Sequence, residues 1–221
     1  MSKPIDAPEY AAISAVSEQI TRRPSRNLAG VSEAEATAEV AELYEHFRVR
    51  FGRPNVPGIL QCFATHPPLL KHMMDLAEDL IFSDGHLGCR TKELIATLVS
   101  SRNQCPYCAD SHGFFLRIHG GSADELHSVL AGNVEASELH QKDRALLAFA
   151  CKVNEQSNTV QPADIETLRG VGWSDAQIAE AIHVTALFAT YNRVANAFGL
   201  ESQGLLSLPE PADVPSGDRH E

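Results

Sequence analysis

Basic residues are scarce in this sequence, and their scarcity limits the partners that the chain can bind. Its 221 residues hold 18 Lys and Arg against 29 Asp and Glu, which gives a formal net charge of -11 at pH 7. Such a charge repels the phosphate backbone of nucleic acids and anionic lipid headgroups. We therefore expect neither a nucleic acid nor a membrane surface among its partners.

Long hydrophobic runs are also missing. No segment of the sequence approaches the roughly 18 apolar residues that a membrane-spanning helix requires. The first twenty residues are interrupted by charged residues and a proline, so they lack the apolar centre of a secretory signal. We expect a cytoplasmic protein whose cysteines are kept reduced.

Strand-like patterns and several common functional motifs are absent too. No segment shows repeated alternation of apolar and polar residues between turns, which argues against a β-sheet fold. The glycine-rich phosphate loops of nucleotide-binding proteins and the HExxH pattern of metalloproteases are not found. The sequence therefore predicts an all-α fold.

Apolar residues recur at helical spacing in segments that glycine and proline residues separate. This pattern predicts helices within residues 32–52, 67–84, 94–99, 114–120, 122–131, 146–153, 161–170 and 174–198. Ser122 and Ser174 each begin a capping box, in which a serine and a Glu or Gln three residues later bind the first amides of a helix. Gly199 is expected to end the last helix.

The domain organisation follows from composition. We expect one all-helical domain over residues 31–207, preceded by a loosely ordered segment, residues 1–30, that is polar and mixed in charge. Residues 208–221 are rich in proline and acidic residues, which is typical of a disordered acidic tail.

Five cysteines are present, an odd number without the regular spacing of a secreted disulfide framework. Only Cys105 and Cys108 stand close together, and in a cytosolic protein such a Cys-x-x-Cys pair indicates redox chemistry or metal binding. Cys62, Cys89 and Cys151 are interpreted as small core residues.

Glu93 and His112 fall in the segments on either side of the cysteine pair. In an antiparallel helical hairpin that turns near Asn103, Glu93 lies ten residues before the turn and His112 nine after it. At about 1.5 Å per residue both stand roughly 14 to 15 Å from the turn, so they can face each other. His112 also follows Cys108 by one helical turn, on the same face. The spacing thus predicts a chain of carboxylate, imidazole and thiol.

This arrangement suits peroxide chemistry. The two cysteines would occupy the first turn of their helix, where free amide groups and the helix dipole favour a thiolate. His112 could also take the proton of the thiol. A thiolate attacks the O–O bond of a peroxide and becomes a sulfenic acid, which a neighbouring thiol converts into a disulfide. Cys105 is placed for that second step.

Other interpretations of the same residues stay open at this point. The two cysteines and His112, with Glu93 or another histidine as a fourth ligand, could bind zinc, although structural zinc sites usually bring a second ligand pair. The cysteines could also be a chance pair of buried residues. Haem attachment is excluded because Ala109, and not a histidine, follows the second cysteine.

The spacing of Glu93, Cys105, Cys108 and His112 resembles that of the alkylhydroperoxidase AhpD-like family, within the carboxymuconolactone decarboxylase-like superfamily. The sequence is most similar to the peroxidase-related members, over about residues 40–199. The resemblance implies an all-helical bundle built around the hairpin with the CxxC motif, and it implies a homo-oligomer.

The resemblance also implies a role for each residue. Cys108 corresponds to the peroxidatic cysteine and Cys105 to its resolving partner, while His112 and Glu93 form the proton relay. The best-known family peroxidases often have a histidine just before the second cysteine, where this chain has Tyr107, a further candidate for the relay. The expected substrate is a hydroperoxide, the reductant a dithiol or lipoyl-type group, and no metal or organic cofactor is required.

Two alternatives to a thiol peroxidase are kept. One is a zinc-binding interaction domain without enzymatic activity, and the other is a carboxymuconolactone decarboxylase-like enzyme that acts on a small carbonyl substrate. The decarboxylase branch generally lacks the cysteine pair, which argues against the decarboxylation of a lactone. Among the remaining polar residues, Asn192 and Arg193 could cap a neighbouring helix or orient an acidic substrate, and the cap is the preferred interpretation. His119 is expected to lie on a helix surface, and His183 to be an interior histidine.

Overall fold

The computed structural model describes residues 26–52, 55–136 and 138–208. Over these residues the regular secondary structure is entirely helical, which confirms the predicted all-α fold. In chain order the elements are η1 (Glu33–Glu35), α2 (Ala38–Phe51), α3 (Gly58–Phe63), α4 (Pro67–Leu80), α5 (Cys89–Arg102), α6 (Pro106–Ile118), α7 (Ala123–Leu130), α8 (Gln141–Gln156), η2 (Ser157–Thr159), α9 (Pro162–Gly170), α10 (Asp175–Phe198) and η3 (Leu205–Ser207).

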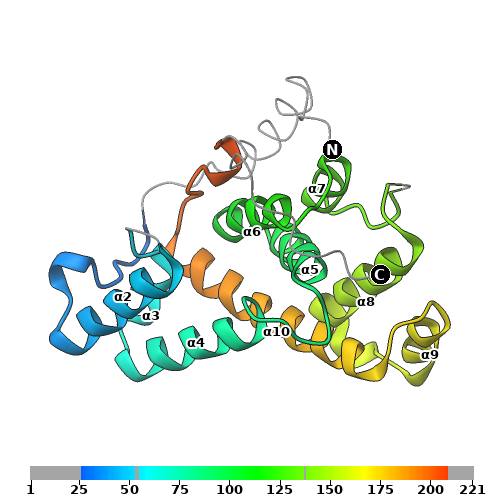
Figure 1. The fold of residues 1–221 in the computed structure, drawn as a ribbon, viewed down its shortest axis with the longest axis horizontal. Coiled ribbons are helices and arrows are strands. Elements are labelled where there is room, and N and C mark those ends of the chain that lie inside the picture. Colours follow the sequence, from blue (N-terminus) through cyan, green and yellow to red (C-terminus); the bar gives the residue numbers. More distant parts are fainter. Residues whose placement is uncertain (1–25, 53–54, 137, 209–221) are drawn as a thin grey trace.

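Helix α10 runs along most of the length of the molecule, with α2, α3 and α4 toward one end and α8 and α9 toward the other (Figure 1). Helix α5 packs against α6, α7, α8 and α10, so it is enclosed from several sides. Every residue from Lys92 to Ser100 is buried as a result. The middle of α5 is therefore the centre of the core, and Glu93 lies within it.

The predicted helix ends are present. The N–H of Glu125 donates to the Oγ of Ser122 (3.1 Å), and its carboxylate accepts the N–H of Ser122 (2.8 Å). Ser174 and Gln177 form the same reciprocal pair at the start of α10, with distances of 3.3 and 3.1 Å. Gly199 follows the last residue of α10 with a φ of 74°, a conformation that glycine adopts at little cost.

Two features differ from the expectation. Helix α3 was not predicted, because six residues are too few to show a helical period. Residues 26–30, assigned from sequence to a loosely ordered segment, are held against the fold, since the N–H of Asn27 donates to the carbonyl of Phe198 (2.9 Å). Residues 1–25 and the expected tail after Leu208 lie outside the described residues, so the limits of the domain stay a prediction.

A buried ion pair lies next to Glu93. The Nζ of Lys92 is 2.7 Å from the Oε1 of Glu180 and donates to the carbonyl of Ser83 (2.9 Å). Glu180 also accepts the N–H of Leu87 at 2.8 Å. A buried charge needs such compensation from a partner and from hydrogen bonds. Lys92 is thus paired with Glu180 and not with its neighbour in sequence, Glu93.

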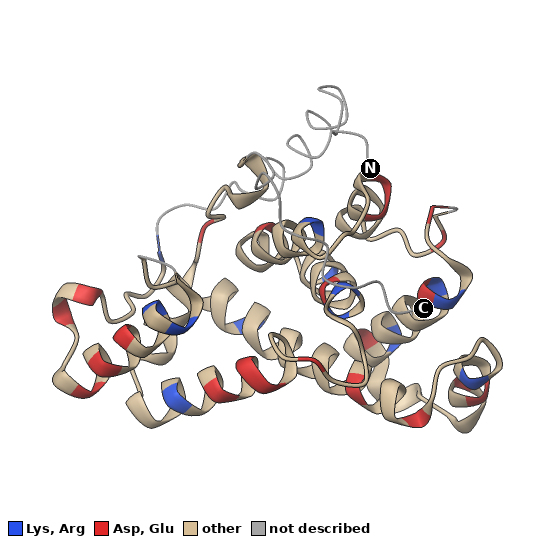
Figure 2. Cartoon of the chain, in the orientation of Figure 1, with Lys and Arg blue, Asp and Glu red and all other residues tan. Residues whose placement is uncertain are grey.

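The charged residues of helices α2 and α4 are mainly acidic. Acidic positions recur along α2 and α4 (Figure 2), namely Glu39, Glu42, Glu45, Asp75, Glu78 and Asp79. None of the helices in the described ranges has both the length and the apolar character to cross a membrane.

Candidate active site

The turn between α5 and α6 positions the cysteine pair. The N–H of Cys105 donates to the carbonyl of Ser100 (2.9 Å), which closes the turn over Gln104. Gln104 has a φ of 52° and is the only non-glycine residue with positive φ in the described ranges. Pro106 then begins α6, where its fixed φ suits a first helical position. Cys105 is thus the N-cap residue of α6, and Cys108 lies in the first turn.

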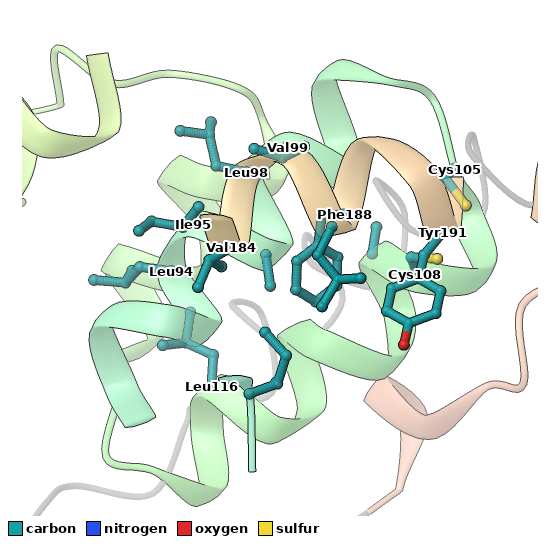
Figure 3. Close-up of a cluster of buried hydrophobic side chains, with 14 of the residues drawn as sticks. Leu94, Ile95, Leu98, Val99, Cys105, Cys108, Leu116, Val184, Phe188 and Tyr191 are labelled. Atoms are coloured by element: carbon teal, nitrogen blue, oxygen red, sulfur yellow. The ribbon is translucent and has the colours of Figure 1, made fainter. Parts of the chain in front are cut away.

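The two sulfurs differ in their access to solvent. Both cysteines are free thiols, but Cys105 is 0% exposed and Cys108 is 4% exposed. Cys108 forms part of the wall of a cavity to which Cys105 does not contribute. Figure 3 shows both at one end of a buried apolar cluster, with the ring of Tyr191 beside Cys108. A molecule in the cavity therefore meets Cys108 and not Cys105.

The thiols are coupled to each other. A hydrogen bond with Cys105, burial and the charge that Cys105 can carry together raise the pKa of the Cys108 thiol well above its ordinary value. A hydrogen bond from the side chain of Asn192 lowers this pKa. The preference for a thiolate expected from the helix start is thus outweighed at Cys108. Its ionisation needs a base.

His112 lies on the same helix, one turn after Cys108. The Nδ1 of His112 is 2.7 Å from the Oε2 of Glu93, and the two side chains are 14% and 2% exposed. Phe188 and Phe115 pack edge-on against the imidazole, with ring centroids 4.5 and 5.6 Å away. These contacts hold the ring in one orientation. In the part of the chain that the structure describes, the other ring nitrogen, Nε2, makes no hydrogen bond and is left for proton exchange.

The cavity beside Cys108 and His112 is largely apolar. Its volume is about 320 Å³. The apolar lining comes from α2, α3, α4, α6 and α10 and from the segments next to them: Phe47, Phe51, Pro57, Ile59, Leu60, Ala77, Ile81, Phe82, Phe115, Ile118 and Phe188. No charged Lys, Arg, Asp or Glu side chain of the described residues lines it. Such walls suit a neutral organic molecule whose reactive end reaches the thiol.

Tyr107 also lines this cavity. Its hydroxyl accepts the backbone N–H of Ile59 at 3.3 Å, which ties the first turn of α6 to α3. The structure thus assigns Tyr107 a contact that shapes the wall next to the cysteine pair. Its expected part in proton transfer stays a prediction.

The four other polar residues that the sequence analysis considered differ in their burial and contacts. Asn192 is fully buried and bonds to Cys108, a contact that the sequence does not predict. Arg193 is exposed and donates to the carbonyl of Ala189 (2.7 Å) on its own helix, so the expected cap on a neighbouring helix is wrong. His183 is exposed, which corrects the expected interior position, and His119 is exposed at the edge of the cavity, as expected.

The three remaining cysteines, Cys62, Cys89 and Cys151, do not line the cavity. Burial raises the pKa of Cys62 and of Cys151 to about 11, and it is also the main cause that raises the pKa of Cys89. Cys62 is buried as expected, whereas Cys89 and Cys151 are only partly buried. Raised pKa values keep these thiols protonated and unreactive at neutral pH.

The zinc alternative requires a set of ligands. Within residues 26–52, 55–136 and 138–208, no group of three or more His, Cys, Asp and Glu side chains is arranged to hold a metal ion. The Nδ1 of His112 is already bound to Glu93. The ligand set that the sequence left open is therefore not assembled in this part of the chain.

The fold and part of the sequence are similar to known proteins. Residues 67–138 match the carboxymuconolactone decarboxylase family. An uncharacterized peroxidase-related protein of Ralstonia eutropha JMP134, described as an alkylhydroperoxidase AhpD core, has a TM-score of 0.72 and 27% identity over 85% of this chain and 99% of its own. A peroxidase-related protein of Silicibacter sp. TM1040 has a TM-score of 0.71 and 26% identity over 84% of this chain and 97% of its own.

Two further proteins are similar to this chain at lower identity or over a shorter segment. The debrominase Bmp8 has a TM-score of 0.65 and 16% identity over 82% of this chain and 94% of its own, so it shares the fold alone. Uncharacterized protein 4 in the cox locus of Paracoccus denitrificans is 38% identical over 47 residues. These residues are 21% of this chain and 42% of that protein, so the chain spans about two fifths of the length of this curated relative.

Proposed function

Because this chain belongs to the carboxymuconolactone decarboxylase-like superfamily, in its AhpD-like, peroxidase-related branch, we propose that it is a thiol-dependent peroxidase. The observation that carries the proposal is one apolar cavity with both Cys108 and His112 in its wall. Glu93 orients His112, and Cys105 lies next to Cys108 as the second thiol.

In the proposed reaction, His112 takes the proton of Cys108 and the thiolate attacks the terminal oxygen of a hydroperoxide. The S–O bond forms as the O–O bond breaks, and His112 returns the proton to the departing alkoxide, which leaves as an alcohol. Cys108 is then a sulfenic acid. The sulfur of Cys105 attacks it, the disulfide forms, and the hydroxide leaves with the Cys105 proton as water.

A dithiol then returns two electrons. One of its sulfurs attacks the disulfide and the other closes a new disulfide on the reductant, while its two hydrogens restore both cysteine thiols. Because Cys105 is fully buried, the reductant has to reach the pair at Cys108, through the same cavity as the peroxide. This route favours a slender arm of the lipoyl type, and the expected cytoplasmic location belongs to the same proposal.

The test is peroxide-dependent consumption of a dithiol by the purified protein, with dihydrolipoamide and cumene hydroperoxide as the two substrates. We expect one dithiol oxidised for each hydroperoxide reduced to its alcohol. Consumption no faster than with the Cys108→Ser variant would overturn the proposal.

The apolar wall predicts a preference for bulky organic hydroperoxides. Ala77 lines the cavity from α4, and a phenyl ring at this position takes up part of the space of about 320 Å³. Ala77→Phe should lower kcat/KM for cumene hydroperoxide about tenfold or more and change that for hydrogen peroxide little. Ala179 is exposed and outside the cavity, so Ala179→Phe is the matched control. Equal losses with both peroxides would contradict the assignment of the substrate to this cavity.

The two alternatives make different predictions. Stoichiometric zinc in protein purified without a chelator would favour the interaction domain and overturn the peroxidase proposal. A reaction on a small carbonyl compound that survives in Cys108→Ser would favour the decarboxylase-like alternative, because the peroxidase needs that thiol for every turnover.

We also propose that the protein is a homo-oligomer, as the resemblance implies. Helix α4 leaves Leu69 and Leu76 exposed, and Leu76 borders a groove against α10. A second copy of the chain would cover such side chains, since closed homo-oligomers are the usual assemblies of soluble chains. Light scattering at micromolar concentration should give a mass of at least two subunits, and a single-subunit mass would refute this expectation.

A further inference from the structure

Helix α10 meets the reactive part of α6 through two residues that lie one helical turn apart. Phe188 packs against the ring of His112, with centroids 4.5 Å apart. Four residues later, the side-chain amide of Asn192 donates a hydrogen bond to the sulfur of Cys108. Because Cys108 and His112 are also four residues apart, each of them has its own partner on α10.

The amide of Asn192 is held in one orientation. Its Nδ2 donates to the Oγ of Ser100 (3.0 Å) as well as to Cys108, and its Oδ1 accepts from the Nδ2 of Asn103 (2.9 Å). Rotating the amide by half a turn would set Nδ2 against another donor and Oδ1 against the sulfur. Since Asn192 is fully buried, water does not compensate for such a loss. The donor end therefore faces Cys108.

Asn103 is itself fixed by a reciprocal pair. Its Nδ2 donates to the Oδ1 of Asn154 (3.0 Å), and the Nδ2 of Asn154 donates to its Oδ1 (2.8 Å). One turn after Asn192, the Nδ2 of Asn196 donates to the backbone carbonyl of Asn103 (3.1 Å). This chain of amides joins the turn after α5 to α8 and α10, and Asn192 extends it to the sulfur of Cys108.

The surroundings of Cys108 offer the thiolate few other donors. Cys105 bonds to it, and the titratable residues that share its cavity wall are Tyr107, His112, His119 and Tyr191, with Glu93 bound to His112. Burial and the charge of Cys108 raise the pKa of Tyr191, and its hydroxyl donates to a backbone carbonyl of α4 at 3.0 Å. No Lys or Arg of the described residues lines the cavity. The amide of Asn192 is thus a neutral donor at a site without a fixed cation.

We propose that Asn192 is a further catalytic residue, whose amide holds the sulfur of Cys108 and favours its thiolate, and that Asn103 is the positioning residue that fixes this amide. The inference rests on the proposed peroxidase function and deepens it. An N–H group donates more strongly to an ionised acceptor than to a neutral one. The bond therefore strengthens as the proton passes from Cys108 to His112, which is the step that starts the reaction.

The test measures the thiol without using peroxide. In a Cys105→Ser background, which removes the coupled thiol, the rate at which iodoacetamide alkylates Cys108 is followed by mass spectrometry as a function of pH. Asn192→Leu should raise the midpoint by about one pH unit or more, which lowers the rate at neutral pH about tenfold. Asn192→Ala also removes the donor and is the second variant, in case leucine prevents folding.

The matched control is Thr185→Val, which removes a buried side-chain hydrogen bond on the same helix, the one from Thr185 to the carbonyl of Ala181. Its alkylation profile should stay unchanged. An unchanged profile in the Asn192 variant that folds, or an equal shift in Thr185→Val, would overturn the proposal. If the profile shifts as expected but the wild-type protein reduces no hydroperoxide, the hydrogen bond is upheld and the peroxidase function is refuted.

Discussion

Replacing Cys108 with serine should abolish peroxide reduction, whereas replacing Cys105 with serine should leave a sulfenic acid on Cys108. The reason is access, because Cys108 is 4% exposed in the cavity wall and Cys105 is 0% exposed behind it. A serine hydroxyl is a far weaker nucleophile than a thiolate, so the first step stops in Cys108→Ser. In Cys105→Ser the first step proceeds, but no second thiol is present to form the disulfide.

The measurement is trapping of sulfenic acid with a dimedone-type reagent, followed by mass spectrometry of the labelled peptide. The matched controls are Cys62→Ser and Cys151→Ser, whose thiols lie outside the cavity lining and have pKa values raised by burial to about 11. Both controls should retain activity. A label on Cys105 in place of Cys108 would reverse the roles of the pair.

The second large effect is expected for the base. His112→Ala should slow peroxide reduction by about 10²- to 10⁴-fold, the usual contribution of a general base. Its Nδ1 lies 2.7 Å from the carboxylate of Glu93, so Glu93→Gln should also slow the reaction, because an amide stabilises the imidazolium less well. Stopped-flow measurement of a single turnover with cumene hydroperoxide separates this step from the later reduction of the disulfide.

The pH dependence has a definite sign. The pKa of Cys108 is raised by its hydrogen bond with Cys105 and by burial, so at neutral pH the thiol is protonated. Without the base, the reaction depends on the fraction of Cys108 that is already thiolate. At pH values below that pKa, this fraction rises about tenfold for each unit by which the pH increases. The loss in His112→Ala should therefore be largest near neutral pH and shrink as the pH rises.

His119→Ala is the matched control for the base, since His119 lines the same cavity but is exposed at its edge. Its pH–rate profile should match that of the wild-type protein. A loss in His112→Ala that does not change with pH would argue for a structural role of the imidazole, and an unaltered profile in Glu93→Gln would remove Glu93 from the mechanism.

The helices could be predicted because their signals are local. The capping boxes at Ser122 and Ser174 and the stop at Gly199 need only residues within one turn, and all three are found in the structure. Helix α3 has six residues and no such signal, so it was missed. His183 lies among apolar neighbours in the sequence, yet its side chain is exposed. The sequence did not predict this, because an apolar stretch does not show which face of a long helix is covered by other elements.

The relation of Glu93 to His112 could also be predicted, since both lie in consecutive helices joined by a short turn. Counting residues from Asn103 sets them level, and the structure joins them at 2.7 Å. The same counting cannot say which of two nearby sulfurs is reachable. That difference depends on α3, α4 and α10, which wall the cavity beside Cys108 and leave Cys105 enclosed.

By itself the sequence determined an all-α fold, the positions of most helices and a Glu93, Cys105, Cys108 and His112 constellation, because periodicity, caps and spacing act over short stretches of chain. Only the tertiary structure decided that Cys108 faces the cavity and that Asn192 reaches its sulfur across 84 positions of sequence. Burial and contacts between distant segments arise from how helices pack, and packing depends on the shapes of all facing side chains together. No local pattern records that information, so the environment of the thiol is a property of the assembled fold.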